Sequence, residues 1–258
     1  MNTSKQKIKA DLQFFYDHEA QKYYETRKKH RDEGETVLEI LNNRKSTDST
    51  KKVRILELGS GSGRFANFLR ENYKGKFEYV GVDMSGELIK YAEKENKQRS
   101  FAHDDMLHFL EEQDQESFDV VVGFASVQHL TSYQERLLLM KYVYRVLKYD
   151  GIFLMINWSL SKRFIRKYWK VILSSIGQIF ISFGKHNWRD LMIPWKNGKK
   201  KYMRFYHLFG IKELKKLALF SGFNLQEVGF LTKGGELVGK WGDAKNSLLV
   251  VRKQPIHF

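Results

Sequence analysis

The fold is decided by the stretch Val53-Arg-Ile-Leu-Glu-Leu-Gly-Ser-Gly-Ser-Gly63, in which an apolar segment runs into three glycines. Gly59, Gly61 and Gly63 are spaced two apart, and a backbone can press this closely on a ligand only where Cβ atoms are absent. A strand that leads into a glycine turn and then into a helix is typical of the nucleotide corner of an open α/β sheet. The stretch therefore predicts such a corner.

Acidic residues after the next two expected strands indicate what this corner binds. The run Phe77–Val82 ends in Asp83, twenty residues past Gly63, and a carboxylate there can accept hydrogen bonds from both hydroxyls of an adenosine ribose. Asp105 follows the third expected strand and offers a carboxylate to an adenine amino group. Together these positions predict a cofactor that contains adenosine.

Two kinds of cofactor fit the glycine turn. The segment Gly61–Ala66 also matches the Gly-x-Gly-x-x-Ala fingerprint of dinucleotide-binding proteins, which alone is weak evidence. Glu57 favours S-adenosylmethionine, because a carboxylate ahead of the glycines can face the cationic amino-acid end of that molecule. With Asp105 and two closing strands near the C-terminus, residues 50–157 resemble the class I S-adenosylmethionine-dependent methyltransferases. The cofactor contacts expected from this are Glu57, Gly59, Gly61, Gly63, Asp83, Met84, Asp105, Met106 and Ala125.

Strands and helices alternate along the first two thirds of the chain, which predicts a parallel sheet with right-handed crossovers. The fold class expected is α/β, a Rossmann-like class I methyltransferase fold whose seven-stranded, mostly parallel sheet has an antiparallel last strand. The expected strands cover about 53–58, 77–82, 98–102, 118–123, 152–157, 223–231 and 247–252. The expected helices cover about 5–30, 34–43, 63–73, 86–97, 106–113, 132–147 and 211–220.

The whole chain, residues 1–258, is expected to be a single methyltransferase domain. Its expected parts are N-terminal helices (1–45), a cofactor-binding core (50–157), a basic aromatic insertion over the cofactor mouth (158–208), and a closing helix and strand hairpin (209–258), with a polar linker over 42–52. The chain has no cysteine, which excludes disulfides and thiolate metal sites, and we expect no metal. We also expect no signal peptide, no stable membrane insertion and a cytoplasmic protein, because residues 1–10 lack an apolar core and 171–183 are too short to span a bilayer.

Positive charge is concentrated in the second half of the chain. Residues 1–140 hold 22 Lys and Arg against 24 Asp and Glu, whereas residues 141–258 hold 23 against 6. A basic half beside a nearly neutral cofactor-binding half favours a polyanionic substrate, since neutralising phosphates drives nucleic-acid affinity. An unspecific, solubility-related charge is the alternative.

A narrower resemblance covers most of the chain. Tyr16–Arg27, Ser126–Leu130, Ile193–Trp195 and Arg204–Phe209 are similar to segments of the eukaryotic tRNA wobble-uridine carboxymethyl methyltransferases. The resemblance implies methyl esterification of a 5-carboxymethyl uridine in tRNA, and it names a small activating protein subunit as a candidate partner. Three positions depart from the family pattern, namely Ser60, Gln128 and Ser247.

A carboxylate acceptor needs no general base, because it is already ionised at neutral pH. It needs alignment, exclusion of water and a cationic or donor clamp. The candidate catalytic residues for that clamp are His129, Arg27, Arg204, Tyr206 and His207. Arg27 has an alternative role, in which it holds the carboxylate of the cofactor itself.

Three other functions are compatible with the sequence. Residues 164–183 mix Lys and Arg with aromatic and aliphatic side chains and resemble an interfacial helix, which favours a methyltransferase for a small-molecule, quinone or lipid acceptor. A methyltransferase for protein substrates is another. The last is a cofactor-binding module without activity that serves as the partner of an active methyltransferase. Intact Glu57, Asp83 and Asp105 argue against that module.

Overall fold

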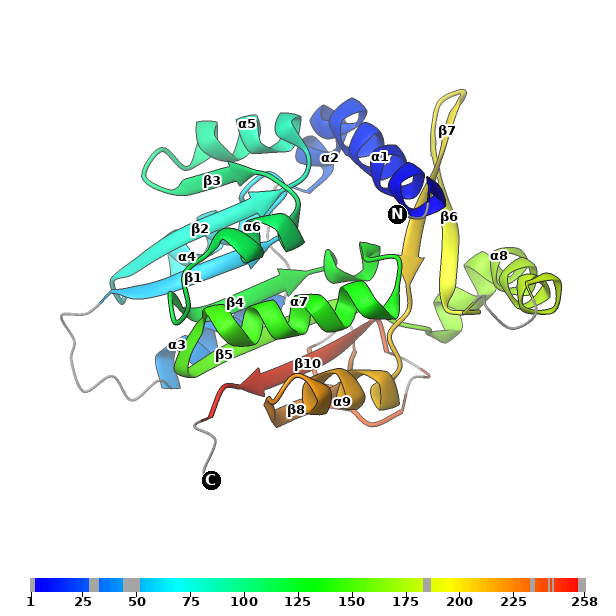
Figure 1. Cartoon of the computed structure of the whole chain (residues 1–258). Coiled ribbons are helices and arrows are strands. Elements are labelled where there is room, and N and C mark those ends of the chain that lie inside the picture. Colours follow the sequence, from blue (N-terminus) through cyan, green and yellow to red (C-terminus); the bar gives the residue numbers. More distant parts are fainter. Residues whose placement is uncertain are drawn as a thin grey trace.

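An eight-stranded sheet organises the protein in the computed structural model, which describes residues 3–27, 33–43, 52–182, 187–232, 235–240, 242 and 244–254 (Figure 1). Its strand order is β3-β2-β1-β4-β5-β10-β8-β9. The strands are β1 (Val53–Leu58), β2 (Phe77–Asp83), β3 (Ser100–His103), β4 (Phe118–Phe124), β5 (Leu147–Trp158), β8 (Asn224–Leu231), β9 (Leu237–Val238) and β10 (Asn246–Arg252). β1 to β5 pair in parallel, and β10 runs antiparallel to both β5 and β8. The expected fold class is confirmed, with the two-residue β9 as an addition.

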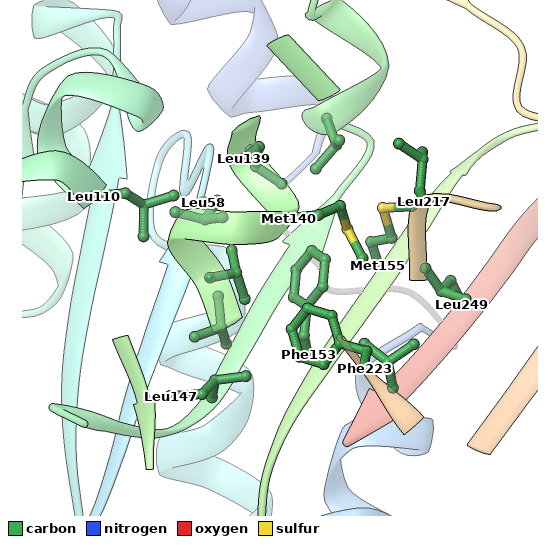
Figure 2. Close-up of a cluster of buried hydrophobic side chains, with 14 of the residues drawn as sticks. Leu58, Leu110, Leu139, Met140, Leu147, Phe153, Met155, Leu217, Phe223 and Leu249 are labelled. Carbon is green, nitrogen blue, oxygen red and sulfur yellow. The ribbon is translucent and has the colours of Figure 1, made fainter. Parts of the chain in front are cut away.

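Helices cover both faces of this sheet. On one face lie α6 (Met106–Glu112), α7 (Tyr133–Val146) and α9 (Ile211–Phe220), whose apolar side chains pack with the sheet into the cluster drawn in Figure 2. On the other face, α3 (Glu33–Asn43) and α4 (Arg64–Asn72) bury a second cluster against the sheet. α5 (Gly86–Glu95) packs beside β2 and β3. Both faces are covered, as a parallel sheet requires.

Local sequence signals set the ends of several helices. The side chain of Ser132 accepts a hydrogen bond from the backbone of Glu135, whose own side chain accepts one from the backbone of Ser132, so the expected capping box starts α7. α9 ends before Gly222, which has a φ of 79° that only glycine adopts without strain. Both helices are confirmed close to their expected bounds.

The leading helix is two helices, so the prediction of one helix over 5–30 is wrong. α1 (Thr3–His18) ends where Glu19 leaves helical geometry with a ψ of 11°, and α2 (Ala20–Thr26) follows. The side chains of Leu12 and Phe15 are buried on the expected face. Residues 28–32 lie outside the described residues, as do residues 44–51 of the expected linker.

Two strands differ from their expected bounds. The third was expected over 98–102 and forms at Ser100–His103, where it can pair with the end of β2. The fifth was expected over 152–157 and starts at Leu147, because the chain pairs with β4 through an irregularity before Val120. The predicted carboxyl ends of the five parallel strands agree with the structure within a residue or two.

Residues after β5 leave the sheet and form a separate layer. The long helix α8 (Lys162–Ile181) is followed by a hairpin of β6 (Asp190–Asn197) and β7 (Lys200–His207). β7 contacts α1 and β6 contacts α8, so the hairpin stands between these two helices, as Figure 1 shows. The hairpin therefore joins α1 to the carboxyl end of the sheet, where β7 also contacts residues 127–129 after β4. No helix within the described residues is long and apolar enough to cross a membrane.

Candidate active site

The three glycines after β1 all have positive φ, but they serve different purposes. A Cβ on Gly59 would lie 2.3 Å from the Cβ of Ser126, and one on Gly63 would lie 3.1 Å from side chains of α5 and β3. These two glycines are required by packing. A Cβ on Gly61 would have only Tyr23 in contact distance, at 4.0 Å. Gly61 therefore faces the open side of the turn, where a cofactor can approach the backbone.

Asp83 at the end of β2 is built into the same turn. Its Oδ2 accepts a hydrogen bond from the backbone N–H of Gly61 at 2.8 Å, and its Oδ1 accepts one from Ser85 at 2.9 Å. Burial raises the pKa of Asp83, against the opposing effect of these two donors. Each carboxylate oxygen has a further lone pair, so the group retains the capacity to accept from ribose hydroxyls.

Glu57 lies in β1, just before the glycine turn, and it does not line the cavity that the site contains. Its carboxylate accepts a hydrogen bond from the hydroxyl of Tyr79, and it is 4% exposed. Burial raises the pKa of Glu57 from 4.5 to about 8, although Tyr79 and Arg64 act in the opposite direction. The contact seen is with a tyrosine hydroxyl, so the role facing the cationic end of the cofactor stays a prediction.

Replacing Glu57 by Gln should make the stability of the cofactor-free protein less dependent on pH. Wild-type Glu57 is protonated when folded and ionised when unfolded between pH 4.5 and about 8, so its folded state loses stability as pH rises through this window. Each pH unit in the window is worth about 1.4 kcal/mol, which gives a few kcal/mol at most. Urea unfolding at pH 5 and pH 8 measures the change. A pH dependence identical in the variant and the wild type would contradict the assigned burial.

Asp105 does not have a free carboxylate. Its Oδ1 caps α6 by accepting from the backbone of Leu107 and His108, and its Oδ2 pairs with the ammonium of Lys9 at 2.6 Å. The expected contact with an adenine amino group would have to compete with both of these partners. The sequence could not show this, because Lys9 lies on α1, almost a hundred residues away.

The remaining expected cofactor residues lie at strand ends. The carbonyl of Met84 accepts a hydrogen bond from the Nε2 of His103, and Met106 is the first residue of α6. Ala125, directly after β4, has a φ of 53°, which is unusual for a residue with a Cβ, and it lines the cavity. Strained backbone of this kind is often found at functional sites.

A cavity of about 130 Å³ opens where the N-terminal helices, the ends of β4 and β5, and the hairpin meet. Its walls include four cationic side chains, and none of the described residues that line it is Asp or Glu. The lining residues are Tyr16, Tyr23, Arg27, Arg64, Phe124, Ala125, Gln128, Ile156, Trp158, Arg204, Tyr206, Lys245 and Asn246. This lining is suited to an anionic group.

Arg204 is the most buried of these cations, with 3% of its surface exposed. Its guanidinium carbon lies 4.9 Å from the ring centres of Phe15 and Trp195 and 5.0 Å from that of Tyr206. Burial would lower the pKa of Arg204, but the hydroxyls of Tyr206 and Tyr16 outweigh it and the pKa is raised. Its Nε has no hydrogen-bond partner among the described residues. Arg204 is thus a positive charge fixed among aromatic rings, and its Nε–H can still donate a hydrogen bond.

Arg27 also lines the cavity, and its role as a clamp or as the partner of the cofactor's carboxylate stays a prediction. Its guanidinium lies over the ring of Tyr23, 4.0 Å from the centre, and within 5.4 Å of Trp195. Its Nη1 is buried and has no partner among the described residues. An unpaired buried guanidinium nitrogen is costly, so a ligand oxygen at this place would stabilise the site.

His129 does not line the cavity but contacts two tyrosines that do, Tyr16 and Tyr206. Its Nδ1 donates to the carbonyl of Phe205 at 2.7 Å, and its Nε2 accepts from the hydroxyl of Tyr16 at 3.0 Å. Burial lowers the pKa of His129 to about 4, so the ring is neutral at pH 7. The expected clamp role is therefore corrected: His129 orients Tyr16 rather than the acceptor.

His207 is likewise wrong as a clamp residue. It is fully buried, and its two ring nitrogens lie 2.6 Å from Asp190 and 2.8 Å from Glu213. Burial would raise the pKa of Glu213, but His207 and Arg136 outweigh it and lower that pKa. His207 ties β7 to β6 and α9, which makes it part of the fold.

Two tyrosines of the N-terminal helices had no role assigned from the sequence. Tyr16 on α1 and Tyr23 on α2 both line the cavity, and their rings contact edge to face at 5.6 Å. Their spacing of seven residues would place both on one face of an unbroken helix, but the break at Glu19 puts them on two helices, so the sequence carried no signal for this contact. Arg64 and Lys245 gave no signal either, since each is one charge among many in its segment.

Comparison with known proteins identifies the class. A family model described as a methyltransferase domain matches residues 49–207, and the chain belongs to this family. A curated protein of Encephalitozoon cuniculi that is named as a methyltransferase is 28% identical over 216 residues, covering 83% of this chain and 88% of that protein. The protein is a methyltransferase that depends on S-adenosylmethionine, which supplies the reactive sulfonium methyl group when bound.

Solved structures share the fold over nearly the whole chain. An S-adenosylmethionine-dependent methyltransferase of Methanosarcina mazei has a TM-score of 0.62 at 20% identity, covering 83% of this chain and 97% of that one. The 1,6-didemethyltoxoflavin-N1-methyltransferase of Burkholderia thailandensis, with S-adenosylhomocysteine bound, has 0.61 at 13%, covering 99% and 92%. A Haloferax volcanii methyltransferase in complex with the activator Trm112 has 0.61 at 15%, covering 96% and 99%.

Proposed function

We propose that this methyltransferase esterifies a carboxylate, and we infer that the carboxylate is the 5-carboxymethyl group of a wobble uridine in tRNA. The observation that carries the proposal is the cavity with four cations and no acidic residue among its described lining. The cofactor brings one carboxylate of its own, which one cation, such as Arg27, can neutralise. Of the other cations in the lining, Arg204 is the most buried, and its positive charge favours an anionic acceptor.

The lack of an available base supports the same acceptor. His129 has both nitrogens in hydrogen bonds, and the pKa of Tyr16 is raised by burial and by Tyr206. A phenol or ammonium acceptor would have to lose a proton before attack, whereas a carboxylate is already ionised. In this proposal Arg204 holds the acceptor, while Tyr16, Tyr206 and Trp158 exclude water from it.

The tRNA part of the proposal rests on charge and on sequence resemblance. The tip of the β6–β7 hairpin exposes Lys199, Lys200 and Lys201, and the excess charge of the chain lies in the same half. A folded nucleic acid cannot enter a cavity of about 130 Å³, so the acceptor base would have to leave its stack to present its carboxylate there. A small activating subunit, as in the Haloferax volcanii complex, and a cytoplasmic location would fit a tRNA enzyme.

The chemical step should be nearly flat from about pH 6 to pH 9 at saturating cofactor. A carboxylate stays ionised throughout, and the pKa of His129, at about 4, lies below the window. His129→Gln should slow the reaction only modestly, through poorer positioning of Tyr16. Single-turnover rates across this range measure the profile. A rate that climbs steeply with pH and loses this climb in His129→Gln would contradict a carboxylate acceptor.

Reversing the three hairpin lysines should weaken tRNA binding strongly and leave cofactor affinity unchanged. In Lys199→Glu/Lys200→Glu/Lys201→Glu the salt dependence should also become shallower, by about 0.9 in the log–log slope for each duplex phosphate that the variant no longer neutralises. A matched control is the triple reversal of Lys212, Lys215 and Lys216, which are exposed on α9. Equal weakening in both triple variants would show that only total charge matters.

The direct test is the chemistry of the product. Mass spectrometry of tRNA nucleosides from cells with and without the gene should show the methyl ester replaced by the free 5-carboxymethyl form when the gene is absent. Label transferred from S-adenosylmethionine to this tRNA should be released as methanol by mild alkali, because esters hydrolyse and N-, C- or ether-linked methyl groups do not. Alkali-stable label would contradict the proposal.

A small-molecule acceptor is the second candidate, favoured by the small size of the cavity under α1 and α2. A quinone or lipid acceptor belongs to this class. Labelling cell extracts with S-adenosylmethionine and testing each fraction for alkali-labile label separates the two candidates. Label in a low-molecular-mass or lipid fraction, with none in tRNA, would favour the second.

A further inference from the structure

Helix α8 presents an apolar stripe to solvent. Trp169, Leu173, Ile176 and Phe180 are spaced by four, three and four residues, which places them on one side of a helix. They are 51%, 57%, 38% and 78% exposed. Large apolar side chains clustered in this way usually mark an interaction surface.

The opposite side of α8 fixes this orientation. The hydroxyl of Ser175 is within hydrogen-bond distance of the carbonyls of Trp188 and Asp190, at 3.1 and 3.0 Å. Phe164 is buried beside Trp158, with ring centres 6.5 Å apart. The helix therefore cannot turn its apolar stripe inward, and in Figure 1 it lies at the periphery of the molecule, away from the large sheet.

Cationic residues lie next to the stripe, on both sides of a kink in α8 at Tyr168. α8 contains five Lys and Arg and no Asp or Glu, and all five cations are exposed. They are Lys162, Arg163, Arg166, Lys167 and Lys170. Lys170 lies 5.4 Å from the ring centre of Trp169, so charge and apolar surface are contiguous. An anionic partner with an apolar layer beneath its charges complements such a surface.

We propose that α8 docks the enzyme on the surface of an anionic lipid bilayer. The stripe would insert among the upper acyl chains, and the cations would meet lipid phosphates at the headgroup level. RNA fits this surface less well, because Leu173 and Ile176 have no aromatic face on which a base can stack. The docking goes beyond the proposed methyl transfer and does not depend on it.

Vesicle co-sedimentation of the full-length protein tests the docking. Phosphatidylcholine vesicles with phosphatidylserine should bind the wild type, whereas pure phosphatidylcholine vesicles should bind it at least about tenfold more weakly, since each cation near an anionic surface contributes about fivefold. Adding salt should weaken binding to the vesicles that contain phosphatidylserine, because salt screens the attraction between the cations and the lipid charges.

Two pairs of variants locate the surface. Leu173→Ser/Phe180→Ser should reduce binding to anionic vesicles at least about tenfold, while the matched Leu219→Ser/Phe220→Ser on α9, where these residues are 71% and 57% exposed, should not. Arg166→Glu/Lys170→Glu should likewise reduce it, while Lys215→Glu/Lys216→Glu should not. All four variants alter exposed side chains, and thermal unfolding checks that each is folded.

Three outcomes would overturn the proposal. One is wild-type protein that does not sediment with anionic vesicles at low salt. Another is equally reduced binding in the α8 variants and their α9 controls. The third is unchanged vesicle binding in Leu173→Ser/Phe180→Ser. If this variant also failed to bind tRNA that the wild type binds, the stripe would be assigned to RNA.

Discussion

Gly61→Val should abolish measurable binding of S-adenosylmethionine while the protein stays folded. The Cβ of the variant residue meets only Tyr23, at 4.0 Å, so the fold has room for it. The added side chain instead occupies the side of the turn from which a cofactor approaches. Overpacking of this kind costs about 1–3 kcal/mol or more, so we expect calorimetry to show an affinity that is lower by about 10²-fold or more.

Backbone strain needs its own control, because valine at a φ of 53° is unfavourable by about 1–2 kcal/mol. Gly198 in the turn of the hairpin has nearly the same φ, 57°, and a Cβ there would meet nothing within 4 Å. Gly198→Val should lose a similar amount of stability and keep its cofactor affinity. If Gly61→Val bound the cofactor as tightly as Gly198→Val does, the cofactor site assigned to the glycine turn would be wrong.

Arg204→Gln should lower the rate of methyl transfer to the acceptor by about 10²-fold or more without changing cofactor affinity. Arg204 is buried, positively charged and has an unpaired Nε among the described residues, so its removal takes away the donor that is held ready for an anion. Single-turnover methylation of tRNA from cells lacking the gene measures the rate of methyl transfer. Calorimetry with S-adenosylmethionine measures the cofactor affinity.

Arg189→Gln is the matched control for this variant. Arg189 also lies against the hairpin, where its Nη1 donates to the carbonyl of Leu208 at 3.2 Å, but it does not line the cavity. Its removal should affect stability more than rate. Rates that fall equally in both variants would indicate that the charge acts on the fold and not on the acceptor.

The core of the fold could be predicted from the sequence because its signals are local. Val53–Gly63 specifies a strand and a turn by itself, since apolar β-forming residues precede glycines that alone tolerate positive φ. The capping box at Ser132 and Glu135 sets the start of α7 within four residues of chain. Alternation of such elements is enough to define a doubly covered parallel sheet.

The break between α1 and α2 was beyond such reasoning. Nothing around Glu19 resembles a helix stop, and its carboxylate instead accepts a hydrogen bond from Asn197 on the hairpin. The chain bends there because the two helices must follow α5 and the hairpin, which lie far away in sequence. Contacts of this kind override weak local preferences.

The sequence by itself determined the class of protein, the cofactor and the strand ends at which the site lies. Only the tertiary structure decided which candidates line the cavity. His129 and His207 both looked like clamp residues, yet one is held by Tyr16, 113 residues away, and the other joins Asp190 to Glu213. A side chain's free hydrogen-bonding capacity depends on partners brought together by folding. Of the predicted clamp residues, Arg27, Arg204 and Tyr206 line the cavity, where α1, α2 and the hairpin meet the sheet, whereas His129 and His207 do not.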